Sequence, residues 1–500
     1  MKIEFPSREF DDAVAAVCHG LVSDEQADAL NELLRRNAAA RDEYLLRLEL
    51  HSRLASQLDL FASAVTDGRG QEAGGGLLFP SGEGSRASSG VATKRKIIRS
   101  LSLAAGLVLL AAIGWKWQRR NLPPTSESPV FAAAESGWRP SSANLPGQEY
   151  PRLNSEGRAQ FRIRAPQAKD VAVNIGHPLT VTKTDDGVWT ITTEPLGIGF
   201  HFYQLVVDGR KETDPATPIF RGGGGDFISS AIEVPTGDDF HERKNVPHGE
   251  VREQRYFSGT TNDWRRIFVY TPPDYHANPS ARFPVLYLLP GAGEDETCWS
   301  AQGRVSQILD NLIAEKNAKP MLVVMGGGTA QRPGERDTTS RPPADWNRRF
   351  STLDEVFMSD LIPFIDGTYR TLATGDHRAI AGLSLGGAQA FAIGLTHPDR
   401  FAHVGGFSGV GGGPGRNLDF MTAYGGVMAD ADTFNRKMRL LFVSVGGDEP
   451  DWMLNSITRY HEALSAMGIK HVFYTSPETA HEWHTWRRSL REFAPLLFKD

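Results

Sequence analysis

The segment AIAGLSLGGAQAFA, residues 379–392, decides the fold, and the rest of the chain is interpreted around it. Its apolar start predicts a β-strand and its alanine-rich end predicts a helix, with Gly-x-Ser-x-Gly at the junction. A strand, a tight turn and a helix are the setting in which a nucleophilic serine is raised above a sheet. Gly382 and Gly386 suit that turn, because Cβ atoms on either side of the serine would have no room. We therefore predict Ser384 as a nucleophile; the alternative is a structural glycine turn, since the chain contains 51 glycines.

Length and composition set the limits within which this prediction stands. A chain of 500 residues holds about two to four domains. A hydrophobic content of 40% and a charged content of 23% are ordinary for a globular protein. The net charge of −6 gives no indication of nucleic-acid binding. The only two cysteines, Cys18 and Cys298, lie far apart in the sequence, which excludes a disulfide scaffold and a cysteine metal cluster.

The C-terminal half, residues 241–500, has the pattern of a parallel α/β sheet. Apolar runs that predict buried strands alternate with segments of helical periodicity, and about 250 residues are enough to bury a full core. The expected strands are 266–271, 284–289, 321–325, 378–381, 439–445 and 470–474, and the expected helices are 308–318, 357–369 and 452–467.

Residues 150–240 instead predict an immunoglobulin-like β-sandwich. Short alternating strands are expected at 160–166, 171–175, 189–192 and 200–207, and the last of these ends in an Asp-Gly turn. Trp189 lies in one of these strands, where core packing is the favoured interpretation.

The N-terminal third predicts a helical module, a linker, a membrane span and a stalk. In the helical module, residues 1–61, Ser23 and Gln26 form a capping box ahead of one helix, and a second helix follows at 38–60. A flexible Gly/Ser-rich linker is expected at 62–96, and a Pro/Ser-rich stalk at 118–149. Between them, the 21 apolar-rich residues 97–117 meet the length of about 20 that a transmembrane helix needs.

Charges beside this span predict its orientation. Four basic residues precede the apolar core and three follow it: Lys94, Arg95, Lys96 and Arg99, then Lys116, Arg119 and Arg120. The positive-inside rule then favours a single-pass membrane protein with a cytoplasmic N-terminus and a periplasmic or extracellular catalytic domain.

Several motifs in order resemble the esterase D group of α/β-hydrolases. They are VYTPPDY, PVLYLLPGAGEDETCW, DLIPFIDGTYR, AIAGLSLGGAQAFAIGLTHPDRFAHVGGFSG and HEWHTWRRSLREFAPLLF. The group includes feruloyl and acetylxylan esterases of carbohydrate esterase family one. The preceding sandwich resembles early-set domains of carbohydrate-active enzymes, so that the resemblance covers residues 150–500. Residues 1–61 resemble the cytoplasmic module of membrane-bound anti-sigma regulators, which implies a cytoplasmic protein partner.

The resemblance implies a base and an acid for Ser384. The family's histidine opens a His-x-Trp-x-x-Trp segment, which His481 matches with Trp483 and Trp486, whereas His484 is the local competitor. In this fold the acid comes between the serine and the histidine in the sequence.

The loop after the strand that ends at Val445 should supply that acid. The family's Gly-x-x-Asp pattern maps the acid onto Glu449, with Asp448 as the alternative and Asp451 as a weaker one.

Two backbone N–H groups are expected to form an oxyanion hole. They belong to Leu385, which follows the serine, and to Ala292 in the loop after the strand at 284–289. Many relatives have His-Gly in that loop where this chain has Pro290, but the donor acts through backbone atoms beyond Pro290, so we expect activity to be retained. Trp299 nearby is a candidate for substrate binding, and the alternative is that it packs in the core.

These residues predict a serine carboxylic-ester hydrolase that needs neither a metal ion nor an organic cofactor. The resemblance implies feruloyl or acetyl esters on polysaccharide as substrates. The alternatives are an acyltransferase, a siderophore-ester hydrolase, or a membrane signalling protein whose hydrolase-like domain only binds a ligand.

Overall fold

The computed structural model describes residues 137–222, 228–335, 350–411 and 418–499, together with residues 23–37 and a few positions between 4 and 44. The chain separates into two units, Met1–Leu122 and Pro123–Asp500.

The N-terminal unit contains the helix α2, Asp24–Arg36. The predicted capping box is confirmed, because Ser23 Oγ accepts from the Gln26 N–H while the Gln26 side chain accepts from the Ser23 N–H. Leu30 on this helix is buried, as are Phe10 and Val14.

Most of the other N-terminal predictions lie outside the described residues. This applies to the linker at 62–96, the span at 97–117 and nearly all of the helix at 38–60. Among the helices that the structure does describe, none combines the length and the apolar character required to cross a membrane.

The second unit begins with two β-sheets that enclose a common core. One sheet has the order β1-β2-β3-β6-β5, and the other has the order β4-β7-β10-β9, with β8 paired to β7. The strands are β1 Arg139–Pro140, β2 Arg152–Leu153, β3 Ala159–Arg164, β4 Val171–Asn174, β5 Leu179–Lys183, β6 Val188–Thr193, β7 Gly199–Val207, β8 Arg210–Glu212, β9 Phe220–Arg221 and β10 Ile228–Val234.

Packing inside this sandwich follows the alternation of its strands. Phe161 of β3 meets Tyr203 of β7 edge to face, with ring centroids 4.8 Å apart. Trp189 is buried beside them and donates its Nε1–H to the Ala165 carbonyl at 3.0 Å, in keeping with its expected core position.

One boundary requires correction. The stalk was predicted to extend to residue 149, but β1 already pairs with β2 at Arg139–Pro140. The sequence did not predict β1, because its two residues are too few to show the alternation of a strand.

An eight-stranded sheet forms the C-terminal domain, in the order β11-β12-β14-β13-β15-β16-β17-β18. The pairs of β11 with β12 and of β12 with β14 are antiparallel, and all others are parallel. The strands are β11 Glu250–Ser258, β12 Asp263–Thr271, β13 Val285–Leu289, β14 Leu322–Gly326, β15 Arg378–Leu383, β16 His403–Phe407, β17 Leu440–Gly446 and β18 Val472–Ser476.

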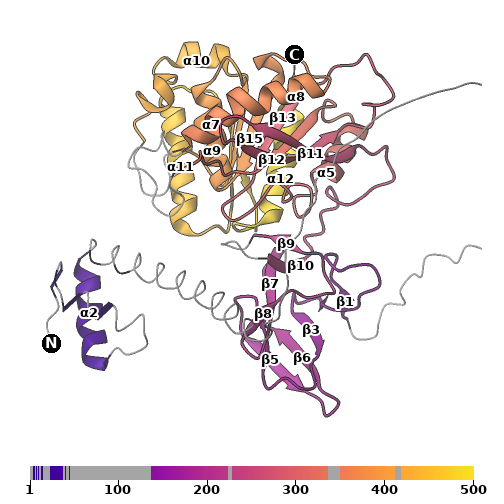
Figure 1. The fold of residues 1–500 in the computed structure, drawn as a ribbon, viewed down its shortest axis with the longest axis vertical. Helices are drawn as coiled ribbons and strands as arrows, with labels where there is room; N and C mark the ends of the chain where they lie inside the picture. The colour runs from indigo at the N-terminus through magenta and orange to yellow at the C-terminus, as the bar shows by residue number, and fades with distance from the viewer. Residues whose placement is uncertain are drawn as a thin grey trace, which may run out of the picture. The chain divides into compact units, whose positions relative to one another are not determined.

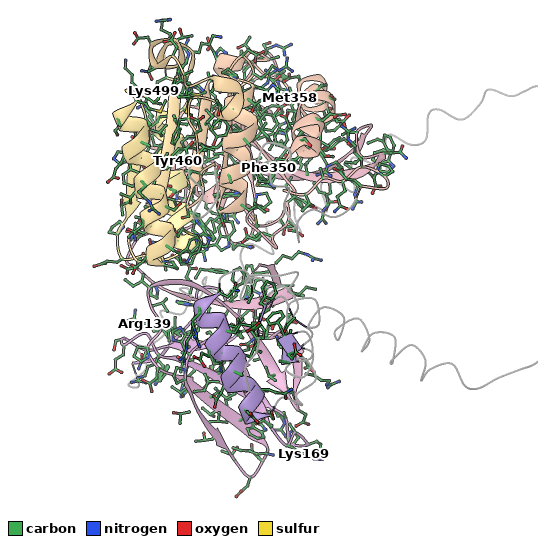
Figure 2. All side chains as sticks on the ribbon, turned by 90° about the vertical axis from the view of Figure 1, so that its left-hand side faces the viewer. Arg139, Lys169, Phe350, Met358, Tyr460 and Lys499 are labelled. Carbon is green, nitrogen blue, oxygen red and sulfur yellow. The ribbon has the colours of Figure 1, made fainter. Side chains whose placement is uncertain are left out.

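Helices cover both faces of this sheet (Figure 1). On one face Phe391 meets Tyr460, which Figure 2 labels, with ring centroids 5.7 Å apart. The helical segments are α5 Val305–Ala314, α7 Ser351–Glu355, the π-helix η1 Val356–Leu361, α8 Ile362–Thr368, η2 Gly375–His377, α9 Leu385–Thr396, η3 Ala423–Gly426, α10 Ala431–Lys437, α11 Asp451–Ala466, α12 Trp483–Phe493 and η4 Ala494–Leu496.

The core under the other face is shared with the sandwich. Phe200 of β7 and Phe220 of β9 belong to the same buried apolar cluster as Trp299 and as Trp483 of α12. The two domains therefore meet through α12, the helix that follows the predicted catalytic histidine.

Candidate active site

Ser384 lies at the sharp turn between β15 and α9. Its backbone has φ 50° and ψ −118°, a region that residues with a side chain rarely occupy and that signals a constrained position. The turn is held because the Ser384 N–H donates to the Phe407 carbonyl at 2.7 Å. The side chain is partly exposed at the carboxyl end of the parallel strands.

Both glycines of the motif are required by close approaches of the backbone. A Cβ on Gly382 would overlap the backbone of Gly386, and a Cβ on Gly386 would overlap the Pro290 carbonyl. The steric reason given for these glycines from the sequence is thus confirmed, and the second contact also places the loop after β13 against the turn.

The structure brings Ser384, His481 and Glu449 together. His481 Nε2 lies 3.0 Å from Ser384 Oγ, and His481 Nδ1 lies 3.3 Å from Glu449 Oε2. A carboxylate only accepts hydrogen bonds, so Nδ1 carries the proton and Nε2 of the neutral ring accepts from the serine hydroxyl. This arrangement suits transfer of the hydroxyl proton to the imidazole during attack on a carbonyl carbon.

Glu449 is held by donors on its other side. Its side chain is fully buried, Ser408 Oγ donates to Oε1, and the Gly446 N–H donates to the same oxygen at 3.1 Å. Ser408 in turn accepts from Trp486 Nε1 at 3.0 Å. Ser408 therefore fixes the carboxylate that faces His481.

The competing residues lie elsewhere. Asp448 is exposed, and it is the Glu449 carboxylate that meets the ring of His481. The ring of His484 is buried against the sandwich, where Nε2 lies 3.1 Å from Asp238 Oδ2. Burial lowers the pKa of His484 to about 4, although Asp238 opposes this shift.

The two predicted oxyanion donors lie in elements that adjoin Ser384. Leu385 is the first residue of α9, where a backbone N–H has no partner within the helix. Ala292 is exposed in the loop that contacts the turn at Gly386.

Glu294 organises that loop. Its Oε2 accepts from the Gly291 N–H at 2.9 Å, while its Oε1 accepts from Trp483 Nε1 at 3.0 Å. Burial raises the pKa of Glu294 to about 7, against the lowering effect of these two donors. One carboxyl group thus joins the loop after β13 to the segment that follows His481.

The substrate-binding role predicted for Trp299 requires correction. The side chain is 1% exposed, Nε1 donates to the Leu289 carbonyl at 2.9 Å, and the ring meets Trp483 edge to face at 5.2 Å. It has no surface to offer a substrate, so its alternative role in the core is the one observed.

Two residues near the site were missed from the sequence. Glu294 gave no signal, because its partner Trp483 lies 189 residues away in the sequence. Glu482 was missed because no helix was predicted after His481, whereas the structure shows that its side chain caps α12.

Among the described residues, one buried group has the spacing of a metal site: Glu233, His241 and His484. Glu233 already forms ion pairs with Arg487 and Arg304, whose positive charges oppose a cation at this place. The group is part of the contact between the two domains.

Comparison with known proteins places this geometry in context. Residues 258–496 match the family model described as putative esterase. An endo-1,4-beta-xylanase/feruloyl esterase of Xylanibacter ruminicola is 38% identical over 371 residues, covering 72% of this chain and 47% of the relative. The chain therefore spans about half the length of this curated relative.

A solved structure shows the same fold at lower identity. The enterobactin esterase of Shigella flexneri, in the presence of enterobactin, is 19% identical with a TM-score of 0.50, covering 68% of this chain and 92% of that chain. A CE1 ferulic acid esterase of Anaeromyces mucronatus is 21% identical with a TM-score of 0.44, covering 52% of this chain and 95% of that chain. Residues 258–496 therefore have the α/β-hydrolase fold and match the model of the putative esterase family.

Proposed function

We propose that the chain is a serine carboxylic-ester hydrolase in which Ser384 is the nucleophile, His481 the base and Glu449 the residue that orients His481. The observation that carries the proposal is the continuous contact from Ser384 Oγ through the imidazole to the buried Glu449 carboxylate.

In the first half of the reaction, Ser384 Oγ bonds to the ester carbonyl carbon while its proton moves to His481 Nε2. The Glu449 carboxylate stabilises the imidazolium that results. The backbone N–H groups of Leu385 and Ala292 stabilise the negative charge on the former carbonyl oxygen. When this intermediate collapses, the alcohol leaves with the proton from His481, and the acyl group stays on Ser384.

In the second half, water replaces the alcohol. His481 Nε2 takes a proton from the water as its oxygen bonds to the acyl carbon. Collapse of this intermediate returns the proton to Ser384 Oγ and releases the carboxylic acid.

We further propose feruloyl or acetyl esters of polysaccharide as the substrates. The support is the 38% identity to a relative whose name includes feruloyl esterase, over an alignment longer than the family match itself. The proposed membrane anchor at 97–117 and the cytoplasmic partner of residues 1–61 stay predictions, which fractionation of cells that express the full chain would test.

A panel of esters tests the function. The full-length chain should hydrolyse methyl ferulate, aryl acetates or acetylated xylan, and Ser384→Ala should abolish this activity. Asp448→Asn is the matched control, because Asp448 is exposed and should leave turnover near the wild-type level. If enterobactin were cleaved and the other esters were not, the substrate class would be wrong. If Ser384→Ala retained wild-type turnover, the nucleophile would be wrong.

A further inference from the structure

Glu482, the residue after His481, is bound by both domains. Its Oε2 accepts from the His484 N–H at 2.7 Å, and its Oε1 accepts from the Thr485 N–H at 3.2 Å, so that it caps α12. The same Oε2 also accepts from the N–H of Phe200, at 2.9 Å, on strand β7 of the sandwich. A single carboxylate thus ties the end of the His481 loop to a strand 282 residues away in the sequence.

The choice of glutamate at this position indicates that the cap is not its only role. The side chains preferred at a helix N-cap are those of Ser, Thr, Asp and Asn, because they are short. Glutamate is one methylene longer than aspartate, and here the carboxylate both caps the helix and reaches β7.

The sandwich leaves no spare room around this carboxylate. A Cβ on Gly199, the first residue of β7, would lie 2.6 Å from the carboxyl carbon of Glu482. Gly199 also has φ +116°, a backbone conformation that residues with a side chain rarely adopt. The close approach of strand and carboxylate therefore depends on this glycine.

His481 lies in the loop that ends at Glu482, so its position depends on how this loop is held. Thr485, in the first turn of α12, donates its Oγ1–H back to the Ala480 carbonyl at 2.5 Å, which closes the loop on its other side. The His481 ring must stay within hydrogen-bonding distance of Ser384 and Glu449 at once. A displacement of about 1 Å is enough to reduce turnover by about 100-fold.

We propose that Glu482 is a positioning residue for His481, and that the β-sandwich, through the Phe200 N–H, is a working part of the catalytic site. This inference rests on the proposed function of Ser384 and His481. The sandwich then contributes to turnover itself and is not merely a domain attached to the esterase domain.

The test uses three variants of the full-length chain. Glu482→Asp keeps an efficient helix cap but withdraws the carboxylate from β7. Gly199→Ala places a methyl group against the same carboxylate from the side of the sandwich. Gly187→Ala is the matched control, since Gly187 also has positive φ (+78°) and its Cβ would overlap Pro166, at a place within the sandwich.

Steady-state kinetics with an aryl acetate give the first measurement. We expect kcat to fall at least tenfold in Glu482→Asp and Gly199→Ala while KM stays within about twofold, and we expect Gly187→Ala to keep the wild-type kcat. Thermal unfolding of each variant shows how much protein is folded at the assay temperature. Equal losses of kcat in Gly199→Ala and Gly187→Ala, or wild-type kcat in Glu482→Asp, would overturn the proposal.

A second measurement does not need turnover. In ¹⁵N-histidine-labelled protein, the low-field Nδ1–H resonance of His481 reports its bond to Glu449. It should be present in the wild type and Gly187→Ala, and shifted or broadened in Glu482→Asp and Gly199→Ala. If the wild type were inactive but showed this pattern, the proposed esterase function would be rejected and the positioning role of Glu482 would stand. If the resonance were unchanged in all four proteins, the positioning role itself would be rejected.

Discussion

Replacing Glu233 by glutamine should leave Arg487 and Arg304 without their buried counter-ion. Glu233 of β10 is 5% exposed and pairs with Arg487 of α12, whose side chain is 0% exposed, and with Arg304, whose side chain is 17% exposed. Burial raises the pKa of Glu233, but the charges of Arg487 and Arg304 outweigh it and hold the pKa well below its ordinary value. The carboxylate is therefore ionised throughout the neutral range, and its loss leaves positive charge unpaired between the domains.

Removing one partner of a buried ion pair leaves the other charge uncompensated, which lowers the free energy of unfolding. We expect Glu233→Gln to lower the free energy of unfolding by about 3–5 kcal/mol. Adding Arg487→Met to Glu233→Gln should recover part of this loss, because one of the unpaired charges is then replaced by an apolar side chain of similar length.

Urea unfolding of the full-length chain, followed by circular dichroism and tryptophan fluorescence, measures the effect. Glu253→Gln is the control, since Glu253 pairs with Arg255 at 3.2 Å between side chains that are 43% and 62% exposed. A surface pair of this kind contributes at most about 1 kcal/mol. A loss in Glu233→Gln no larger than that of the control would refute the view that this ion pair stabilises the contact between the domains.

Four further predictions concern the site. Glu449→Gln should lower kcat by about 10³–10⁴-fold, as expected when the residue that orients the base is lost, while Asp448→Asn should stay within about threefold of wild type in the same ester assay. Ser408→Ala should lower kcat about tenfold, because the Glu449 carboxylate loses its hydroxyl donor; unchanged kcat would leave Ser408 with no part in the site. Trp299→Phe should cost about 1–3 kcal/mol in thermal or urea unfolding, because the Leu289 carbonyl loses its donor, and a tenfold rise in KM would instead restore its role in substrate binding. With the pKa of Glu294 raised to about 7 from 4.5, the folded chain keeps a proton that the unfolded chain loses between these values. This carboxyl therefore contributes a fall in the free energy of unfolding as pH rises through that window, by at most about 1.4 kcal/mol per pH unit, and Glu294→Gln should remove this contribution from the slope measured in pH-dependent urea titrations.

The parts of the site that local geometry determines could be predicted from the sequence. The turn at Ser384 could be predicted from the segment 379–392, because two glycines are needed wherever a serine is raised this sharply. The predicted strands and helices of the C-terminal domain likewise follow from periodicity, and their ends moved by only a few residues. The choice between Glu449 and Asp448 could not be made in this way, since neighbouring residues in a loop differ only in the direction of their side chains.

Contacts between distant segments carried no signal of their own. Trp299 was placed beside the oxyanion loop correctly, but nothing local says whether a tryptophan there faces a substrate or the core. Glu482 binds Phe200, and Arg487 binds Glu233 254 residues earlier in the chain. Such partners are chosen by the packing of one domain on another, which the sequence of either domain alone does not encode.

Trapping the acyl-enzyme tests the central claim most directly. The full-length chain is mixed with p-nitrophenyl acetate, quenched in acid within the first turnover, digested and analysed by mass spectrometry. The account predicts a burst of about one p-nitrophenol per chain and one acetyl group on the peptide that contains Ser384, both absent from Ser384→Ala. Ester cleavage with no acetyl group on Ser384, or with the acetyl group on Ser408 or another residue, would contradict it.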